Sequence, residues 1–95
     1  MREFEWDDAK NAANLVKHGI SFEEAATIWN GTVVSGVDET HHSELREISF
    51  GLIGGTAIVC VVHTDRHGKT RIISARKATR NERRLYDAYL AKARR

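Results

Sequence analysis

Arginines on predicted strands are the residues in this sequence best suited to binding a phosphate group. The planar guanidinium of arginine contacts two phosphate oxygens at once and stays charged at any relevant pH. Arg46 and Arg76 are the first candidates, because each falls within a stretch that predicts a β-strand, and a strand holds a side chain more tightly than a loop. Arg71 is the next candidate. The alternative for Arg76 is a structural ion pair with Glu82 or Glu47.

Histidine and glutamate are the candidates for proton transfer. The sequence contains five histidines, whose ordinary pKa of about 6.5 suits proton transfer near neutral pH. His63 is the first candidate because it ends the apolar run at residues 57–62; its alternative role is that of a strand-end histidine bonded to a neighbour. Glu44 can act as a base or instead orient Arg46. Helix capping already explains His18.

Positive charge gathers in the second half of the chain. The formal net charge is only +2, but residues 1–47 hold four Lys and Arg against ten acidic residues, whereas residues 48–95 hold eleven against three. This division predicts a surface that faces a polyanion. Arg83 and Arg84 have the alternative role of keeping an exposed helix soluble. The other candidate contacts are Lys17, Arg66, Lys69, Arg71, Lys77 and Arg80.

The sequence has no pattern typical of a metal or cofactor site. Only His41 and His42 are adjacent, and neither a second cysteine nor a glycine-rich phosphate loop is present. Cys60, the only cysteine, lies in an apolar run, so we expect a buried thiol and a reducing compartment. We therefore predict no metal and no cofactor.

Length and composition predict one soluble domain over residues 1–95. A chain of 95 residues with 41% hydrophobic and 29% charged residues can bury one core. No stretch approaches the roughly 18 apolar residues of a membrane span, and the first residues lack the apolar segment of a signal peptide. We therefore expect a cytoplasmic protein that does not contact membranes.

Capping signals predict two helices after a short opening strand at residues 4–6. Asp7 can accept hydrogen bonds from the first free amides of the helix that follows it. Gly19, preceded by a lysine and a histidine, is typical of a helix end. Ser21 and Glu24 form the pattern of a capping box, which predicts a second helix.

Period-2 patterns and β-branched residues then predict strands. The third of these strands is apolar on both faces and should be central. If Ile58, Cys60 and Val62 face the helices, His63 lies on the opposite surface of the sheet. We place a hairpin turn at Gly54-Gly55 and a longer loop over residues 65–69. The four expected strands cover residues 32–37, 46–52, 57–63 and 70–76.

A capping box of Thr79 and Glu82 begins a final helix with an apolar side. The order of elements predicts an α+β fold. It has an antiparallel sheet of about four strands, two N-terminal helices and a C-terminal helix.

Several short segments, taken in order, resemble the BrnT family of RelE-like ribonuclease toxins over nearly the whole chain. The most specific are Lys-His-Gly at 17–19 and Arg-Ile-Ile-Ser-Ala-Arg at 71–76. The others are Phe-Glu-Trp-Asp at 4–7, Asn14, Ser-Phe at 21–22, Glu-Leu-Arg at 44–46, Thr-Asp-Arg at 64–66 and Glu-Arg-Arg-Leu-Tyr at 82–86.

The resemblance implies a RelE-like fold, cleavage of RNA and growth arrest, as in the toxin of a type II toxin-antitoxin pair. It also implies neutralisation by a BrnA-type antitoxin with a ribbon-helix-helix DNA-binding domain. The complex would repress its own operon, so the toxin would meet operator DNA only through the antitoxin.

For RNA cleavage without a metal, we expect Arg46 and Arg76 to hold the phosphate, His63 or Glu44 to move protons, and the basic residues to guide RNA. Trp6 and Trp29 can stack on bases, but their places beside helix ends favour core packing. The alternative is a non-catalytic binding module, whose basic face docks an acidic antitoxin and takes part in operon repression.

Overall fold

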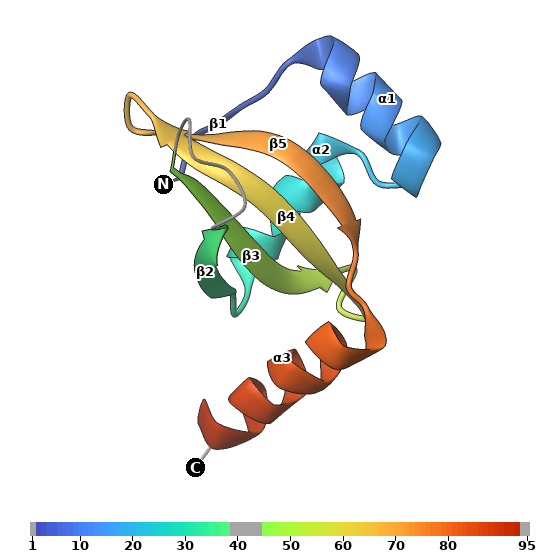
Figure 1. Cartoon of the computed structure of the whole chain (residues 1–95), viewed down its shortest axis with the longest axis vertical. Coiled ribbons are helices and arrows are strands. Elements are labelled where there is room, and N and C mark those ends of the chain that lie inside the picture. The colour runs from blue at the N-terminus through green and yellow to red at the C-terminus, as the bar shows by residue number, and fades with distance from the viewer. Residues whose placement is uncertain (1, 39–44, 94–95) are drawn as a thin grey trace.

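The elements follow in the predicted order of strand, two helices, four strands and a final helix (Figure 1). The computed structural model describes residues 2–38 and 45–93. Its elements are β1 (Phe4–Glu5), α1 (Asp8–His18), α2 (Phe22–Ala26), the 3₁₀ helix η1 (Thr27–Asn30), β2 (Val34–Asp38), β3 (Arg46–Ile53), β4 (Ala57–Arg66), β5 (Lys69–Lys77) and α3 (Arg80–Ala93).

The helices α1 and α2 begin at the predicted caps, and α1 ends at the predicted glycine. Asp7 accepts a hydrogen bond from the backbone N–H of Lys10, 3.0 Å away, at the start of α1. Gly19 ends α1 in the left-handed region, with φ of 73°. Ser21 and Glu24 form both hydrogen bonds of a capping box at the start of α2. These local signals are therefore confirmed.

The sheet has five strands in the order β1-β5-β4-β3-β2, and it is mixed. Strands β2 to β5 form the expected antiparallel meander, but β1 pairs in parallel with β5. The prediction of a four-stranded antiparallel sheet was wrong on this point. Two residues of β1 carry no periodic signal, and their pairing with β5 bridges more than sixty residues of sequence.

A tight turn, not a longer loop, joins β4 and β5. The strands pair as far as Arg66 and Lys69, which leaves only His67 and Gly68 between them. Both have positive φ, 53° and 81°, as a two-residue hairpin of type I′ requires. The expected loop over residues 65–69 was wrong because His-Gly is not one of the pairs, such as Asn-Gly or Asp-Gly, that usually signal this turn.

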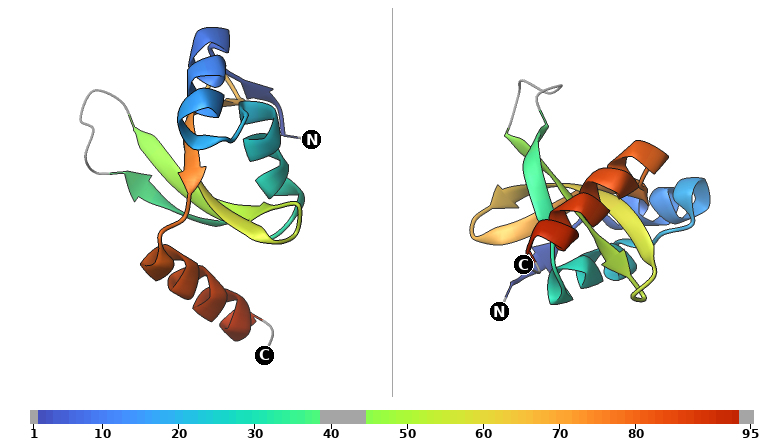
Figure 2. Two further views of the ribbon diagram at one scale, coloured as in Figure 1. Left: turned by 90° about the vertical axis from the view of Figure 1, so that its right-hand side faces the viewer. Right: turned by 90° about the horizontal axis from the view of Figure 1, so that it is seen from below.

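The helices α1 and α2 cover one face of the sheet, and α3 lies on the other side (Figure 2). Val59 and Val61 belong to the core formed with Phe22 and Ile28. By the alternation of a strand, His63 therefore lies on the same side as α2 and η1. Ile58, Cys60 and Val62 do not face α1 and α2, so the assumption that placed His63 on the opposite surface of the sheet was wrong. Cys60 is buried, but it faces the side of α3.

Gly51 explains why the core packs against the face of β3 whose residues are mostly polar or small. A Cβ at Gly51 would lie 2.6 Å from Cβ of Ile28, so η1 can approach β3 closely only where no side chain intervenes. Ser49 and Gly51 are buried on this face, whereas Ile48, Phe50 and Leu52 are only partly buried on the opposite one.

Candidate active site

A cavity of about 430 Å³ opens on the helix-covered face of the sheet, at the end where β4 turns into β5. Acidic, basic and imidazole side chains meet there although they come from distant parts of the chain. Glu47 on β3 pairs directly with His63 on β4, and Arg2 reaches the cavity from the segment before β1. The lining residues are Arg2, Glu47, His63, Thr64, Asp65, Gly68 and Thr70.

His63 is buried at the cavity wall, with 4% of its surface exposed. Its Nε2 lies 2.6 Å from Oγ of Ser49, and the edge of Trp29 packs against its ring with 5.0 Å between centroids. Burial lowers the pKa of His63 below 6.5; the Glu47 carboxylate opposes this by raising that pKa, and Arg2 lowers it further. The environment therefore favours the neutral imidazole, which can accept a proton.

Arg2 is fixed at the cavity by two contacts. Its Nη1 donates a hydrogen bond of 2.9 Å to Oγ1 of Thr70, and its guanidinium carbon lies 5.0 Å from the ring centroid of Trp29. The backbone N–H of Thr70 donates to the carbonyl of Glu3, which continues the parallel pairing of β1 with β5. A guanidinium held in this way presents a cation beside His63, where a phosphate can bind.

Arg46 and Arg76 do not converge on His63. In the register of the sheet, Arg76 on β5 and Phe50 on β3 both stand opposite Cys60 on β4. Arg46 lies on the same face of β3 as Phe50. Both arginines therefore lie on the face opposite His63. Arg46 stands opposite Asp38 of β2 in the sheet register. It lies about four residues, roughly 13 Å, along the sheet from Arg76. The expected two-arginine phosphate clamp is not formed by this geometry.

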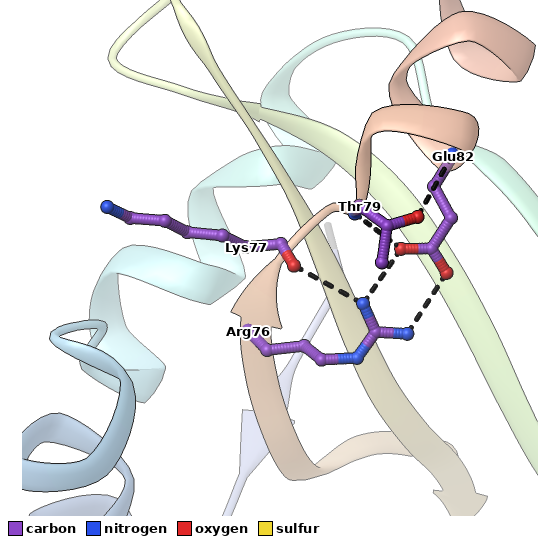
Figure 3. A network of polar contacts seen from close by, with 4 residues as sticks. All are labelled: Arg76, Lys77, Thr79 and Glu82. Carbon is purple, nitrogen blue, oxygen red and sulfur yellow. Dashed lines mark hydrogen bonds and ion pairs between the residues drawn. The ribbon is translucent and has the colours of Figure 1, made fainter.

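Arg76 instead forms the structural ion pair that was its alternative (Figure 3). Its Nη1 and Nη2 donate to the two carboxylate oxygens of Glu82 at 2.8 and 3.0 Å, and Nη1 also contacts the carbonyl of Lys77. This pairing raises the pKa of Arg76 and lowers the pKa of Glu82 to about 2. Because Glu82 also accepts from the Thr79 N–H, the arginine ties β5 to the capping box of α3.

The comparisons with known proteins give the family. A family model described as "Ribonuclease toxin, BrnT, of type II toxin-antitoxin system" matches residues 6–82. The chain belongs to the BrnT family. The crystal structure of the ribonuclease toxin BrnT of Brucella abortus has a TM-score of 0.63 with this chain at 23% identity, over 84% of this chain and all of that one. That likeness confirms the α+β fold. No curated protein matches the sequence.

The basic residues of this BrnT-family chain fall into separate groups. Arg66 and Lys69 pair across the β4–β5 turn, at the cavity's end of the sheet but, by the alternation of the strands, on the face opposite His63. Arg71 is half-buried and bound to Glu5 at 2.9 Å on the opposite face. Lys77 and Arg80 lie at the other end of β5, and Lys17 lies in the last turn of α1. None of these six cations lines the cavity beside His63, and Glu44 lies outside the described residues.

Of the residues that line the cavity, only His63 was a candidate from the sequence of this BrnT-family chain; Glu47 and Arg2 are the two missed residues that matter most for the chemistry. Glu47 depends on the β3–β4 register: the turn spans three residues, Gly54 to Thr56, so Ile53 stands opposite Ala57 and Glu47 opposite His63. The glycine pair in the sequence signals the hairpin, but it leaves this register open by one residue. Arg2 carried no such signal, since only the parallel β1–β5 pairing brings it to the cavity. Trp29 packs against the core as predicted, but it also contacts both Arg2 and His63.

Neither metal-ligand clusters nor membrane spans occur in the parts of this BrnT-family chain that the structure describes. Among residues 2–38 and 45–93, no three His, Cys, Asp or Glu side chains are grouped as metal ligands. Within the same ranges, no helix combines the length and the apolar character needed to cross a bilayer.

Proposed function

We propose that this chain is a metal-independent endoribonuclease toxin that cleaves RNA in the cavity between Arg2, Glu47 and His63. The observation that carries the proposal is the meeting of a neutral buried imidazole, a carboxylate and a fixed guanidinium in one cavity. Cleavage at a 2′-hydroxyl needs a base, a cation beside the phosphate and an acid for the leaving oxygen. His63 can act as the base and Arg2 as the cation, and the proton that His63 takes from the 2′-hydroxyl can then be returned to the leaving oxygen, so that no metal is required.

The division of roles follows from charge and position. Arg2 would hold the phosphate, because it is the cation that Trp29 and Thr70 orient toward His63. His63 would take the proton of the 2′-hydroxyl and then return one to the leaving oxygen, and the neighbouring Glu47 carboxylate would keep the imidazole basic by raising its pKa. Arg66 and Lys69, at the β4–β5 turn, would contact the RNA backbone where it leaves the cavity. In this proposal Arg76 holds α3 in place, and Arg46 remains a candidate for RNA contacts on the other face.

Family membership implies an antitoxin partner, which we propose to be a BrnA-type ribbon-helix-helix protein. The same proposal includes growth arrest by the free toxin and neutralisation of the toxin by the antitoxin. It also includes repression of the operon by the complex. Operator DNA would be contacted through the antitoxin alone. A toxin acting on cellular RNA would work in the cytoplasm.

Cleavage of a short oligoribonucleotide by the purified full chain, with EDTA present, tests the enzyme. We expect cleavage that EDTA does not prevent and that a 2′-deoxy substitution at the cleaved position abolishes. His63→Gln, Glu47→Gln and Arg2→Ala should each reduce the rate by roughly a hundredfold, whereas Lys92→Ala, which removes an exposed cation from the end of α3, should not. A folded native chain that cleaves no RNA would contradict the proposal.

One observation favours the second candidate, a non-catalytic module that docks an antitoxin. Along α3 only Tyr86 is buried, while Leu85 and Tyr89 are 66% and 49% exposed. A small apolar groove of about 140 Å³ runs between α3 and the sheet, lined by Val34, Phe50, Glu82, Leu85 and Tyr86. Under this alternative Leu85→Ser would abolish antitoxin binding, and the native chain would leave cellular RNA intact when its expression is induced.

A further inference from the structure

Side chains from three adjacent strands form a hydrogen-bonded line that leads away from the cavity. Oγ of Ser49 on β3 lies 2.6 Å from Nε2 of His63 on β4 and 2.7 Å from Oγ of Ser35 on β2. Ser49 is fully buried, whereas Ser35 is exposed on the outermost strand of the sheet. The line therefore connects the buried imidazole to the solvent-facing edge of the sheet.

Ser49 occupies a position surrounded by apolar core. Its partner across β4 is Val61, and on β3 the next residue of the same face, Gly51, packs against Ile28. A buried hydroxyl is costly there unless it is hydrogen-bonded, and the serine and histidine on either side provide those bonds. Its two neighbours in the line thus account for a polar residue at the centre of this face.

The ring of His63 is held in one orientation. Ser49 binds Nε2 and the edge of Trp29 packs against the ring at an interplanar angle of 84°, so Nδ1 is the nitrogen left for the cavity. Burial disfavours the charged imidazolium. A proton gained at Nδ1 is therefore accepted more easily if Nε2 gives up its own proton in the same step.

We propose that Ser49 and Ser35 are positioning residues that form a hydroxyl relay between Nε2 of His63 and solvent. When Nδ1 takes a proton from a substrate hydroxyl, Nε2 passes its proton to Oγ of Ser49, and Ser49 passes its hydroxyl proton to Oγ of Ser35. Ser35 then releases its hydroxyl proton to water. The ring is neutral before and after, each serine keeps one proton, and only the tautomer changes. Donation from Nδ1 follows the same steps in reverse.

The catalytic part of this relay rests on the proposed ribonuclease function, but the state of the imidazole can be measured without any substrate. ¹⁵N NMR of the full chain reports which ring nitrogen of His63 carries the proton. We expect one dominant tautomer in the native chain, a mixture of both in Ser49→Ala, and recovery of one in Ser49→Thr, which keeps the hydroxyl. An unchanged ring spectrum in folded Ser49→Ala would overturn the relay.

Kinetics test the proton transfer itself. Ser49→Ala should lower kcat for oligoribonucleotide cleavage by about tenfold to a hundredfold with little change in KM, and it should reduce the solvent isotope effect because fewer protons move together. Ser35→Ala, at an exposed position that tolerates truncation, should have a smaller effect in the same direction, since water can replace its hydroxyl. Cys60→Ala, which truncates an equally buried small residue on the other face of β4, is the matched control.

The outcomes separate the two proposals. A native chain without RNA cleavage overturns the ribonuclease proposal, while the tautomer measurement still decides whether Ser49 controls the imidazole. A native chain that cleaves RNA, together with Ser49→Ala that keeps native kcat and isotope effect, overturns the relay and leaves the ribonuclease in place. If Ser49→Ala does not fold, the ring spectrum of the native chain decides, because a mixture of both His63 tautomers there would contradict the relay.

Discussion

The side-chain amide of Asn14 pairs with both backbone groups of Ala75, which lies 61 residues later in the chain. Nδ2 of Asn14 donates to the carbonyl of Ala75 at 2.9 Å, and Oδ1 accepts from its N–H at 3.2 Å. Nδ2 also donates to the carbonyl of Ile20. Asn14 is the buried residue of α1, whereas Leu15 and Val16 are 48% and 89% exposed. One amide therefore anchors α1 to β5.

We predict that Asn14→Ala lowers the free energy of unfolding by about 2–3 kcal/mol, because it leaves buried backbone groups of Ala75 and Ile20 without partners. Urea denaturation followed by circular dichroism measures the loss. Val16→Ala, on the same helix but exposed, should change stability by less than about 0.5 kcal/mol. Equal effects of the two substitutions would show that the amide does not anchor the helix.

A second stability prediction concerns Gly51. A methyl group there would overlap Cβ of Ile28, which is part of a helical turn and cannot rotate away. Gly51→Ala should therefore cost about 1–3 kcal/mol in unfolding free energy through displacement of η1. Gly36→Ala is the control, since a Cβ at Gly36 on β2 has open space around it. A thermal melt in which both variants match the native chain would disprove the close approach.

Local signals in the sequence were sufficient to predict the caps, the order of elements and the Gly54-Gly55 turn. Each of these depends on residues that are only a few positions apart in the chain. The buried face of β3 was not evident, since the apolar residues Ile48 and Phe50 point away from the main core. Close packing against Gly51 outweighed the hydrophobic pattern. Which face of β3 is buried therefore depends on the path of η1, and no short segment of the sequence encodes that path.

The site was partly predictable for the same reason. His63 could be found because it ends an apolar strand, but the candidate arginines were chosen for being on strands, without knowledge of which face they occupy. Arg76 was expected to hold a phosphate, although Glu82, only six residues later in the chain, is available as its ion-pair partner. Arg2 depends on a parallel strand pairing across most of the chain, and sequence periodicity contains no information about such a pairing.

The ion pair of Arg76 and Glu82 should make stability depend on acid. The pKa of Glu82 falls from 4.5 to about 2 on folding, so the stabilisation is fully present above about pH 4.5 and is lost as pH decreases toward about 2. Solvent screening limits it to about 1 kcal/mol. Glu82→Gln should lower stability at neutral pH and reduce the acid dependence in this window, as measured by urea midpoints across the range. Asp87→Asn, also on α3, should leave both unchanged.

The electrostatic environment of His63 yields a pair of opposite predictions. Because the Glu47 carboxylate raises the pKa of His63 and Arg2 lowers it, Glu47→Gln should lower that pKa further below 6.5, and Arg2→Ala should bring it back toward 6.5. Titration of the His63 ring by NMR measures both shifts without substrate, with Asp87→Asn as a distant charge control. If His63 is the base, the acidic limb of the pH profile for RNA cleavage should move in the same two directions, since activity requires the neutral ring. Shifts of equal sign in the two variants would mean that His63 does not share a cavity with both charges.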